Sequence, residues 1–126
     1  MSGSRAIEGQ IVLLASAKAS VTLARLSELV ERVERYLRER RETYDQDFER
    51  IDGIGGTRYY LTEPEHWDQI GSNLGFDARE TDAVRRSHEA QFRRDGRRLD
   101  RVEEFESALE IRTVVAIGSP GSRSSR

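Results

Sequence analysis

Residues 67–92 read WDQIGSNLGFDARETDAVRRSHEAQF, and this stretch decides the fold because it places two helices at one corner. Gly75 can adopt the left-handed conformation that ends a helix. Asp77 followed by Glu80 has the spacing of a capping box, which opens the next helix. The inward positions of that second helix recur every three or four residues, at Thr81, Val84, His88 and Phe92. The sequence therefore predicts a helical hairpin that turns at Leu74-Gly75-Phe76.

The chain before this hairpin predicts a long charged helix. Its apolar side chains are mostly three or four positions apart, at Leu23, Leu26, Val30, Val33, Leu37, Tyr44, Phe48 and Ile51. Three pairs in the favourable order, with Glu four residues before Arg, support a helix: Glu28–Arg32, Glu31–Arg35 and Glu34–Arg38. We predict a long helical segment over residues 7–51, in which residues 7–20 either extend the helix or form a separate strand.

The length of this helix predicts a partner chain. An unbroken helix over residues 20–50 would be about 45 Å long, whereas a compact domain of this size is only about 35 Å across. A second chain would cover the overhanging apolar stripe, so we expect an antiparallel or coiled-coil homodimer. Arg40 interrupts the stripe, which argues against a long uniform zipper. The predicted dimer seam consists of Leu26, Val30, Val33, Leu37, Tyr44 and Phe48.

Glycines and capping residues organise the middle of the chain. Asp52-Gly53 and Gly55-Gly56 stop the long helix, because glycine is costly inside a helix and tolerates its end. Residues 57–61 fit a short strand. Thr62 and Glu65 have capping-box spacing, which predicts a helix over residues 63–74.

The C-terminal third predicts one more helix and leaves one alternative open. Asp95-Gly96 marks a break or a weak point in the second helix of the hairpin. Residues 111–117 fit either a strand that pairs with residues 57–61 or helical turns packed in the core. The further amphipathic helix carries Leu99, Val102, Phe105 and Leu109.

These patterns predict a mainly α single domain over residues 1–126. It consists of a long charged N-terminal helix, a compact C-terminal helical hairpin with a further helix in a subdomain over residues 57–117, and at most a minor two-stranded β ribbon. The tails, residues 1–6 and 118–126, are rich in Ser, Gly and Arg and are expected to be mobile. The hydrophobic fraction of 36% and the charged fraction of 35% suit amphipathic helices with wide solvated faces.

Composition excludes several classes of site. The chain has no cysteine, which excludes disulfides and thiolate metal sites. The apolar run of residues 11–17, IVLLASA, is too short for a membrane span, and we expect a cytoplasmic protein. The net charge is −2, so any nucleic-acid binding needs a local basic patch. All basic residues except Lys18 are arginines, a bias that a GC-rich coding sequence also produces.

The corner at Gly75 is similar to the helix-turn-helix pattern of DNA-binding proteins. In that pattern a small residue lets the second helix approach, a glycine makes the turn, and aliphatic residues lock the pair. Thr81 departs from it, because an aliphatic residue is usual at that position. The residues that match are Ile70, Gly71, Leu74, Gly75, Phe76 and Val84. The resemblance covers about twenty residues and implies a small DNA-binding regulator in which residues 67–86 dock on DNA.

The charges on the second helix favour a packed helical hairpin over a recognition helix. One face carries Arg79, Asp82, Arg86, Glu89 and Arg93, which alternate in sign and neutralise one another. A basic cluster surrounds Gly96, and it either binds an anion or nucleic acid or pairs with the glutamates of residues 102–117. Its members are Arg85, Arg94, Arg97, Arg98 and Arg101.

The residue pattern contains no catalytic or cofactor motif. The two histidines, His66 and His88, do not have metal-ligand spacing. His88 falls on the apolar face of its helix and is expected in the core, whereas His66 is expected in an exposed first turn. We therefore expect a non-enzymatic interaction or scaffold protein that binds no metal or cofactor and associates with itself. The alternative is the helix-turn-helix regulator, with Arg85, Arg94, Arg97 and Arg98 on phosphates.

Overall fold

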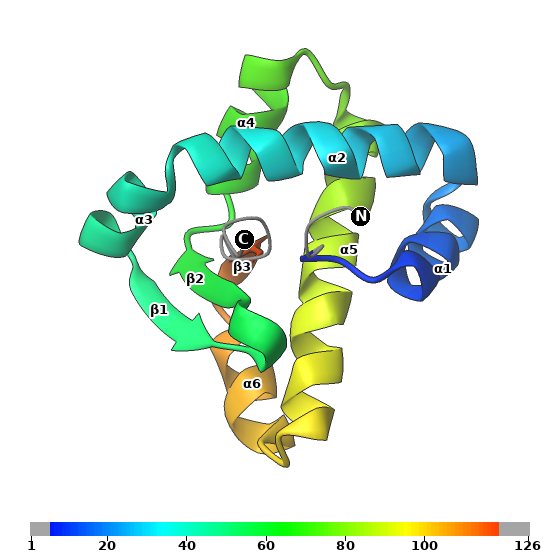
Figure 1. Cartoon of the computed structure of the whole chain (residues 1–126). Helices are drawn as coiled ribbons and strands as arrows, with labels where there is room; N and C mark the ends of the chain where they lie inside the picture. The colour runs from blue at the N-terminus through cyan, green and yellow to red at the C-terminus, as the bar shows by residue number, and fades with distance from the viewer. Residues whose placement is uncertain (1–5, 119–126) are drawn as a thin grey trace, which may run out of the picture.

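The computed structural model describes residues 6–118, and in this part of the chain six α-helices pack around a three-stranded antiparallel sheet (Figure 1). In chain order the elements are α1 (Gly9–Ala19), α2 (Leu23–Glu39), α3 (Arg41–Asp47), β1 (Glu49–Asp52), the 3-10 turn η1 (Ile54–Gly56), β2 (Arg58–Thr62), α4 (His66–Leu74), α5 (Ala78–Arg98), α6 (Val102–Ala108) and β3 (Thr113–Ile117). The mainly helical fold is confirmed. The predicted tails lie outside the described residues, except that Ala6 and Gly118 are buried.

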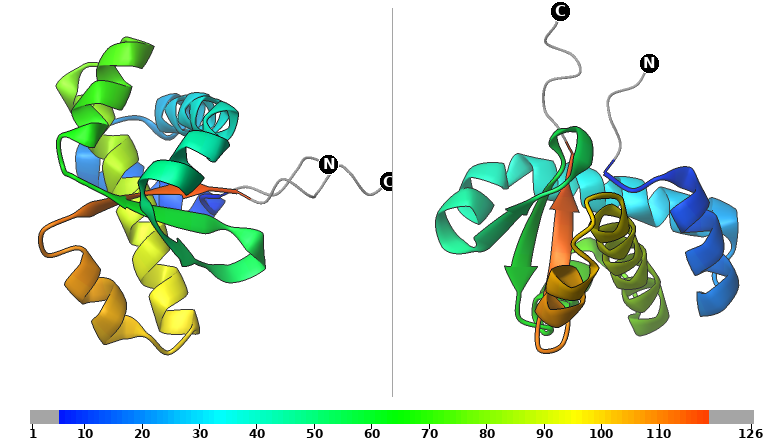
Figure 2. Two further views of the ribbon diagram at one scale, coloured as in Figure 1. Left: turned by 90° about the vertical axis from the view of Figure 1, so that its left-hand side faces the viewer. Right: turned by 90° about the horizontal axis from the view of Figure 1, so that it is seen from below.

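Helix α5 is the central element. It packs along β3, and α1 lies on its other side, so the sheet, α5 and α1 form one row (Figure 2). Helix α2 crosses this row at one end and contacts both α4 and α5, while α6 packs on the far part of α5 (Figure 1). The core lies where these elements meet and is built on large buried side chains such as Leu37, Trp67 and Phe92.

The corner at Gly75 forms as the sequence predicts. Gly75 has a φ of 76° and ends α4. The backbone N–H of Glu80 donates to the Asp77 carboxylate at 2.8 Å, and the backbone N–H of Asp77 donates to the Glu80 carboxylate at 3.1 Å. The capping box therefore opens α5. The two helices approach closely because residue 71 is glycine, since a Cβ there would collide with the side chain of Thr81.

The predicted helix over residues 7–51 is divided into α1, α2, α3 and β1. Ser20 adopts a left-handed conformation that ends α1, and Thr22 caps α2 by accepting the backbone N–H of Arg25 at 3.1 Å. At the other end the Arg40 guanidinium lies 3.6 Å from the centre of the Tyr36 ring and donates to the Tyr36 carbonyl at 2.9 Å. An arginine that donates a hydrogen bond to one of the last carbonyls of a helix stabilises the end of that helix.

The division of this helix removes the overhang from which a dimer was inferred. Helix α2 has 17 residues, about 26 Å at 1.5 Å per residue, and fits within the domain. Of the predicted seam, Leu26, Val30, Val33, Leu37 and Tyr44 are buried in the core of one chain, and Phe48 packs half-buried against it. These side chains are therefore not an exposed seam, because α4, α5 and the sheet of the same chain already cover them. The homodimer stays a prediction.

The sheet is larger than the predicted ribbon. Residues 57–61 and 111–117 do pair, as β2 and β3, with Tyr60 opposite Val115. The third strand, β1, replaces the end of the predicted long helix and pairs with β2 through Ile51 opposite Tyr59. The turn between them closes where the N–H of Gly53 donates to the Thr57 carbonyl at 2.8 Å. Strand pairing outweighs the helical spacing of Ile51, because periodicity reports only local neighbours.

Two predicted helix boundaries differ from the structure. Thr62 does not cap a helix: it ends β2, its hydroxyl donates to the Glu63 carbonyl at 3.2 Å, and α4 starts later, at His66. Asp95-Gly96 does not break α5, which continues to Arg98. Gly96 instead makes room for α6, since a Cβ there would lie 2.9 Å from Cδ2 of Phe105.

The outer edge of β3 is closed by side chains. The indole N–H of Trp67 donates to the Val114 carbonyl at 3.1 Å, and the N–H of Ala116 donates to Nδ1 of His88 at 2.9 Å. Both groups belong to the edge strand of the sheet, whose backbone would otherwise be unpaired inside the core. One side chain from α4 and one from α5 thus replace a fourth strand.

Candidate functional site

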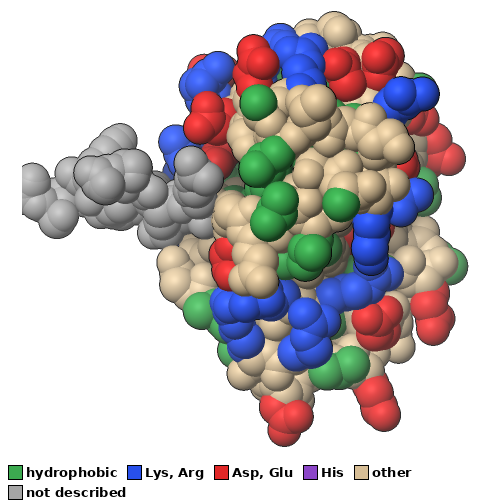
Figure 3. Space-filling view, turned by 90° about the vertical axis from the view of Figure 1, so that its right-hand side faces the viewer, with side chains coloured by type: hydrophobic (Ala, Val, Ile, Leu, Met, Phe, Trp, Pro, Cys, Tyr) green, Lys and Arg blue, Asp and Glu red, His purple; other side chains and the backbone are tan. Residues whose placement is uncertain are grey.

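The candidate site is a groove of about 510 Å³ between α1 and α5. Its floor is apolar, because Ile11 and Ala15 of α1 are buried against α5. Figure 3 shows this face of the molecule, where apolar side chains lie beside a band of basic ones. The lining residues are Ile11, Leu14, Ala15, Lys18, Arg85, Arg86, Glu89, Ala90, Arg93, Arg94 and Arg97.

The apolar wall of the groove is exposed. Leu14, which lines the groove, is 53% exposed, and the preceding Leu13 is 50% exposed outside this lining, although both belong to an α-helix whose other side already packs on α5. The run IVLLASA is apolar around most of the helix, so one part is buried and the other is left in water. Exposed apolar side chains that lie together and border polar ones are typical of an interaction surface.

The opposite wall is basic and only partly neutralised. Arg85 pairs with Glu89 at 3.0 Å and also with Asp82. Arg86 pairs with Asp82 as well, at 2.7 Å. Lys18 and Arg97 have no carboxylate partner among residues 6–118, so their charges face the groove and solvent unpaired.

Glu8, which directly precedes α1, shows how α5 binds a carboxylate. Its side chain accepts from the Arg98 guanidinium at 2.6 and 3.2 Å and from the Gln91 amide at 2.8 Å. Arg94 lies 3.2 Å away as a second cation. The hydrogen bonds from Arg98 and Gln91 lower the pKa of the Glu8 carboxyl, so it is charged at neutral pH. The arginines of α5 are therefore spaced to hold an acidic side chain that comes from outside the helix.

The structure separates the five arginines of the predicted contact. Arg85, Arg94 and Arg97 line the groove, and Arg98 lies beside it on Glu8. Arg101 is apart from them, because it pairs with Glu104 at 2.6 Å and lies over the ring of Phe105. Sequence analysis missed Leu13, Leu14 and Lys18. The signal that could have found them is the run IVLLASA, which is more apolar than one buried helix face requires.

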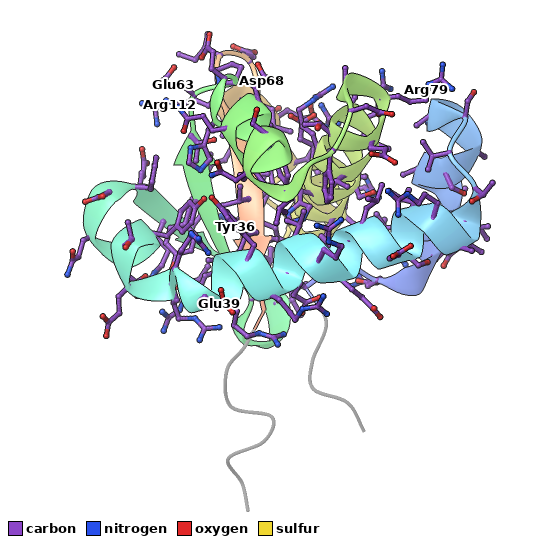
Figure 4. The ribbon with its side chains drawn as sticks, turned by 90° about the horizontal axis from the view of Figure 1, so that it is seen from above. Tyr36, Glu39, Glu63, Asp68, Arg79 and Arg112 are labelled. Carbon is purple, nitrogen blue, oxygen red and sulfur yellow. The ribbon has the colours of Figure 1, made fainter. Side chains whose placement is uncertain are left out.

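The start of α5 does not present a free basic surface. Glu80 pairs with Arg25 of α2 at 3.0 Å, and Asp82 is held by two arginines of its own helix. Arg79 points outward from this end of the helix (Figure 4). On the neighbouring surface, the hydroxyl of Tyr36 accepts from the Asn73 amide of α4 at 2.8 Å. Of the alternating charges predicted from the sequence, Arg86 and Asp82 pair with each other within α5. Glu89 pairs instead with Arg85, and Arg93 pairs with Glu106 of α6.

A second hollow, of about 530 Å³, lies next to the groove toward the start of α5. Arg85 and Glu89 line both hollows. At its outer end Arg112 lies 3.8 Å from Glu63, and Asp68 of α4 is close by (Figure 4). Its charges are of both signs and largely paired, so the arrangement does not select one ligand chemistry.

The two histidines are engaged in packing. His88 is fully buried, its Nδ1 accepts a hydrogen bond, and burial lowers its pKa to about 3. Its proton is therefore on Nε2, which has no hydrogen-bond partner, and the ring packs edge-on against Trp67 with centroids 4.9 Å apart. His66 is half-buried rather than exposed, and Nε2 shares a 2.6 Å hydrogen bond with the Tyr44 hydroxyl. Burial lowers the pKa of His66 too.

Within residues 6–118, neither a metal-binding cluster nor a membrane-spanning helix is present. Residues 6–118 contain no cluster of three or more His, Cys, Asp or Glu side chains placed to hold a metal ion. In the same range, no helix combines the length and the apolar character needed to cross a membrane.

The fold and the groove define a small helical domain with a mixed basic and apolar surface. Comparison with protein families gives its relationship: the chain belongs to the family described as Domain of unknown function (DUF8048), whose model matches residues 5–119. No curated protein and no solved structure matches the chain.

Proposed function

We propose that this chain is a non-enzymatic protein-interaction module and that the groove between α1 and α5 binds a partner segment with acidic and apolar side chains. The observation that supports the proposal most is the exposed side chain of Leu14 in the lining of the groove, together with the unpaired cations Lys18 and Arg97 of the same lining. An amphipathic helix in an apolar groove with charged margins is a common mode of peptide recognition.

The apolar wall favours a protein partner over nucleic acid. A duplex is bound mainly through its phosphates, and exposed leucines contribute nothing to such contacts. Asp82 and Glu89 pair with Arg85 and Arg86, which leaves fewer free cations on α5 than contacts along a phosphate backbone require. A partner with leucine-like and carboxylate side chains would instead satisfy both walls of the groove, as Glu8 already does at one end.

Fluorescence anisotropy tests the proposal with a labelled helical peptide. This peptide has leucines on one face and glutamates on the others. We expect binding, and we expect Leu14→Ser or Arg97→Glu to weaken it about tenfold, since the loss of one well-placed contact costs about 1.4 kcal/mol. Leu23→Ser and Arg79→Glu are matched controls on exposed residues outside the groove. Anionic vesicles form a second arm. Binding to vesicles alone, or peptide binding that the groove variants leave unchanged, would overturn the proposal.

A DNA-binding regulator is the second candidate, and the α4–α5 corner is the observation that favours it. The close approach of the two helices at Gly71 is what the helix-turn-helix pattern requires. Binding to mixed duplex DNA across a salt series tests this candidate. A regulator that uses four arginines on phosphates should show a log–log slope of about −4, whereas negligible binding at low salt rules it out.

A further inference from the structure

Helix α6 carries the opposite charge from the groove. Its outward positions are occupied mainly by glutamates. Glu103 on the helix and Glu110 in the turn after it have no ion-pair partner among the described residues. Exposed apolar side chains flank the helix: Leu99 is 36% exposed, Val102 45% and Ile111 78%. Acidic and apolar side chains therefore lie together on α6, as basic and apolar side chains do along the groove.

The two surfaces are neighbours on one face of the molecule. Arg93 lines the groove and pairs with Glu106 of α6 at 3.1 Å, so α6 borders the basic wall. Figure 3 shows the order across this face, with apolar side chains in its middle, a basic band below them, and acidic side chains at the lower margin. A face with adjacent basic and acidic bands is complementary to a second copy of itself turned by a two-fold rotation.

We infer that the partner of the groove is a second copy of this chain, with α6 of each copy lying in the α1–α5 groove of the other. The inference rests on the proposed function of the groove. It places Glu103 of one copy opposite Arg97 of its partner, and Glu110 opposite the partner's Lys18. The unpaired charges of the two surfaces are then matched. The intramolecular pair of Arg93 and Glu106 is the same kind of contact within one chain.

The dimensions of the two surfaces agree. Helix α1 has 11 residues and α6 has 7, which correspond to about 16 Å and about 10 Å, so α6 fits along the groove. The contact is built from exposed charges around a small apolar centre. Such charges are screened by salt, and the dimer should weaken several-fold as the ionic strength rises. The inferred interface also differs from the coiled-coil seam on α2, whose side chains are buried.

Sedimentation velocity over a concentration series tests the inference by charge reversal. Arg97→Glu and Glu103→Arg should each weaken self-association about tenfold or more, because each change places like charges opposite one another twice in the dimer. Mixing the two variants should restore association to near the wild-type level. In the mixed dimer, the glutamate introduced at position 97 faces the arginine introduced at position 103, and the other contact is the natural pair.

Exposed residues away from this face supply the controls. Arg35→Glu and Glu39→Arg, both at exposed positions of α2, change the charge by the same amounts, and we expect wild-type association from both. Circular dichroism of every variant establishes that the fold is retained. A dimer that the groove and α6 variants leave intact, or a mixture of the two variants that does not associate, would overturn the inference.

The two proposals fail in distinguishable ways. If the wild-type chain stays monomeric at hundreds of micromolar while the acidic helical peptide binds the groove, the second copy is not the partner but the proposed function stands. If the chain is monomeric and the peptide does not bind, both proposals fail. Association that persists in high salt and is lost in Leu14→Ser alone would show an apolar contact without the inferred pairing of charges, and it overturns the inference.

Discussion

The buried imidazole of His88 should make the stability of this protein depend on pH. Its Nδ1 accepts the N–H of Ala116 and is surrounded by core side chains, so burial keeps the ring neutral and lowers its pKa to about 3. In the unfolded chain a histidine has a pKa near 6.5. Between these two values the unfolded state binds one proton more than the folded state, so stability falls as the pH falls through this window.

The size of the effect follows from this difference in pKa. Stabilisation by the neutral ring is fully present above pH 6.5 and is lost progressively toward pH 3. Between pH 7 and pH 5 the expected loss is about 2 kcal/mol, and over the whole window it approaches about 5 kcal/mol. Such a loss is a large part of the stability of a typical small domain.

Urea unfolding of the wild type and of His88→Gln at pH 7, 6 and 5 measures this contribution. Glutamine retains an oxygen that can accept the Ala116 N–H but does not titrate in this range. The variant should be less stable at pH 7 by about 1–3 kcal/mol, because the shape of the ring is lost, yet it should lose about 2 kcal/mol less than the wild type on going to pH 5. Equal losses in the two proteins would refute the reasoning.

The same substitution at His66 is the matched comparison. His66 is half-buried, and burial lowers its pKa in the same direction. His66→Gln should therefore remove a smaller part of the pH dependence than His88→Gln. A larger effect at His66 would place the main titrating group beside Tyr44 and not at the edge of β3.

Three further substitutions have expected effects on thermal or urea unfolding. Gly96→Ala should destabilise by about 1–3 kcal/mol despite the better helix propensity of alanine, because its Cβ would meet the Phe105 ring; a stabilised variant would contradict this packing. Tyr59→Phe removes the 2.7 Å donor to the buried carboxylate of Asp95 and should cost about 1–3 kcal/mol; an unchanged midpoint would show that other donors suffice. Gly75→Ala places a side chain at a φ of 76° and should cost about 1 kcal/mol, and a neutral result would mean that the corner relaxes.

Local sequence signals predicted those parts of the fold that depend on neighbouring residues. The corner at Gly75 and the capping box of Asp77 and Glu80 involve atoms at most five residues apart, and both form as expected. The break predicted at Asp95-Gly96 is wrong because the role of this site depends on a contact with another helix. The meaning of Gly96 depends on Phe105, which packs against it from another helix, and spacing along the chain cannot show that contact.

The difference between local signals and contacts of distant residues also explains which residues of the candidate site could be predicted from the sequence. Arginines on α5 were predicted as a contact because they are dense in the sequence. The groove itself is formed by α1 and α5, whose groove-lining residues lie more than sixty positions apart in the sequence, so its apolar wall was not recognised as part of the same surface. The predicted seam on α2 has ideal helical spacing, but spacing shows only that a face is apolar and not which element covers it.

The closure of β3 by Trp67 and His88 has a consequence for the ways in which this sheet can grow. A peptide that binds as an added strand needs a row of free backbone groups, and the Val114 and Ala116 groups are already taken. Growth of the sheet is therefore restricted to the outer edge of β1, where charged side chains in the short stretch Glu49–Asp52 oppose stacking of further strands. Removal of the Trp67 indole, or replacement of His88 by a residue without a hydrogen-bond acceptor, would open a second, apolar edge. Such variants should aggregate through strand pairing before they lose their helices.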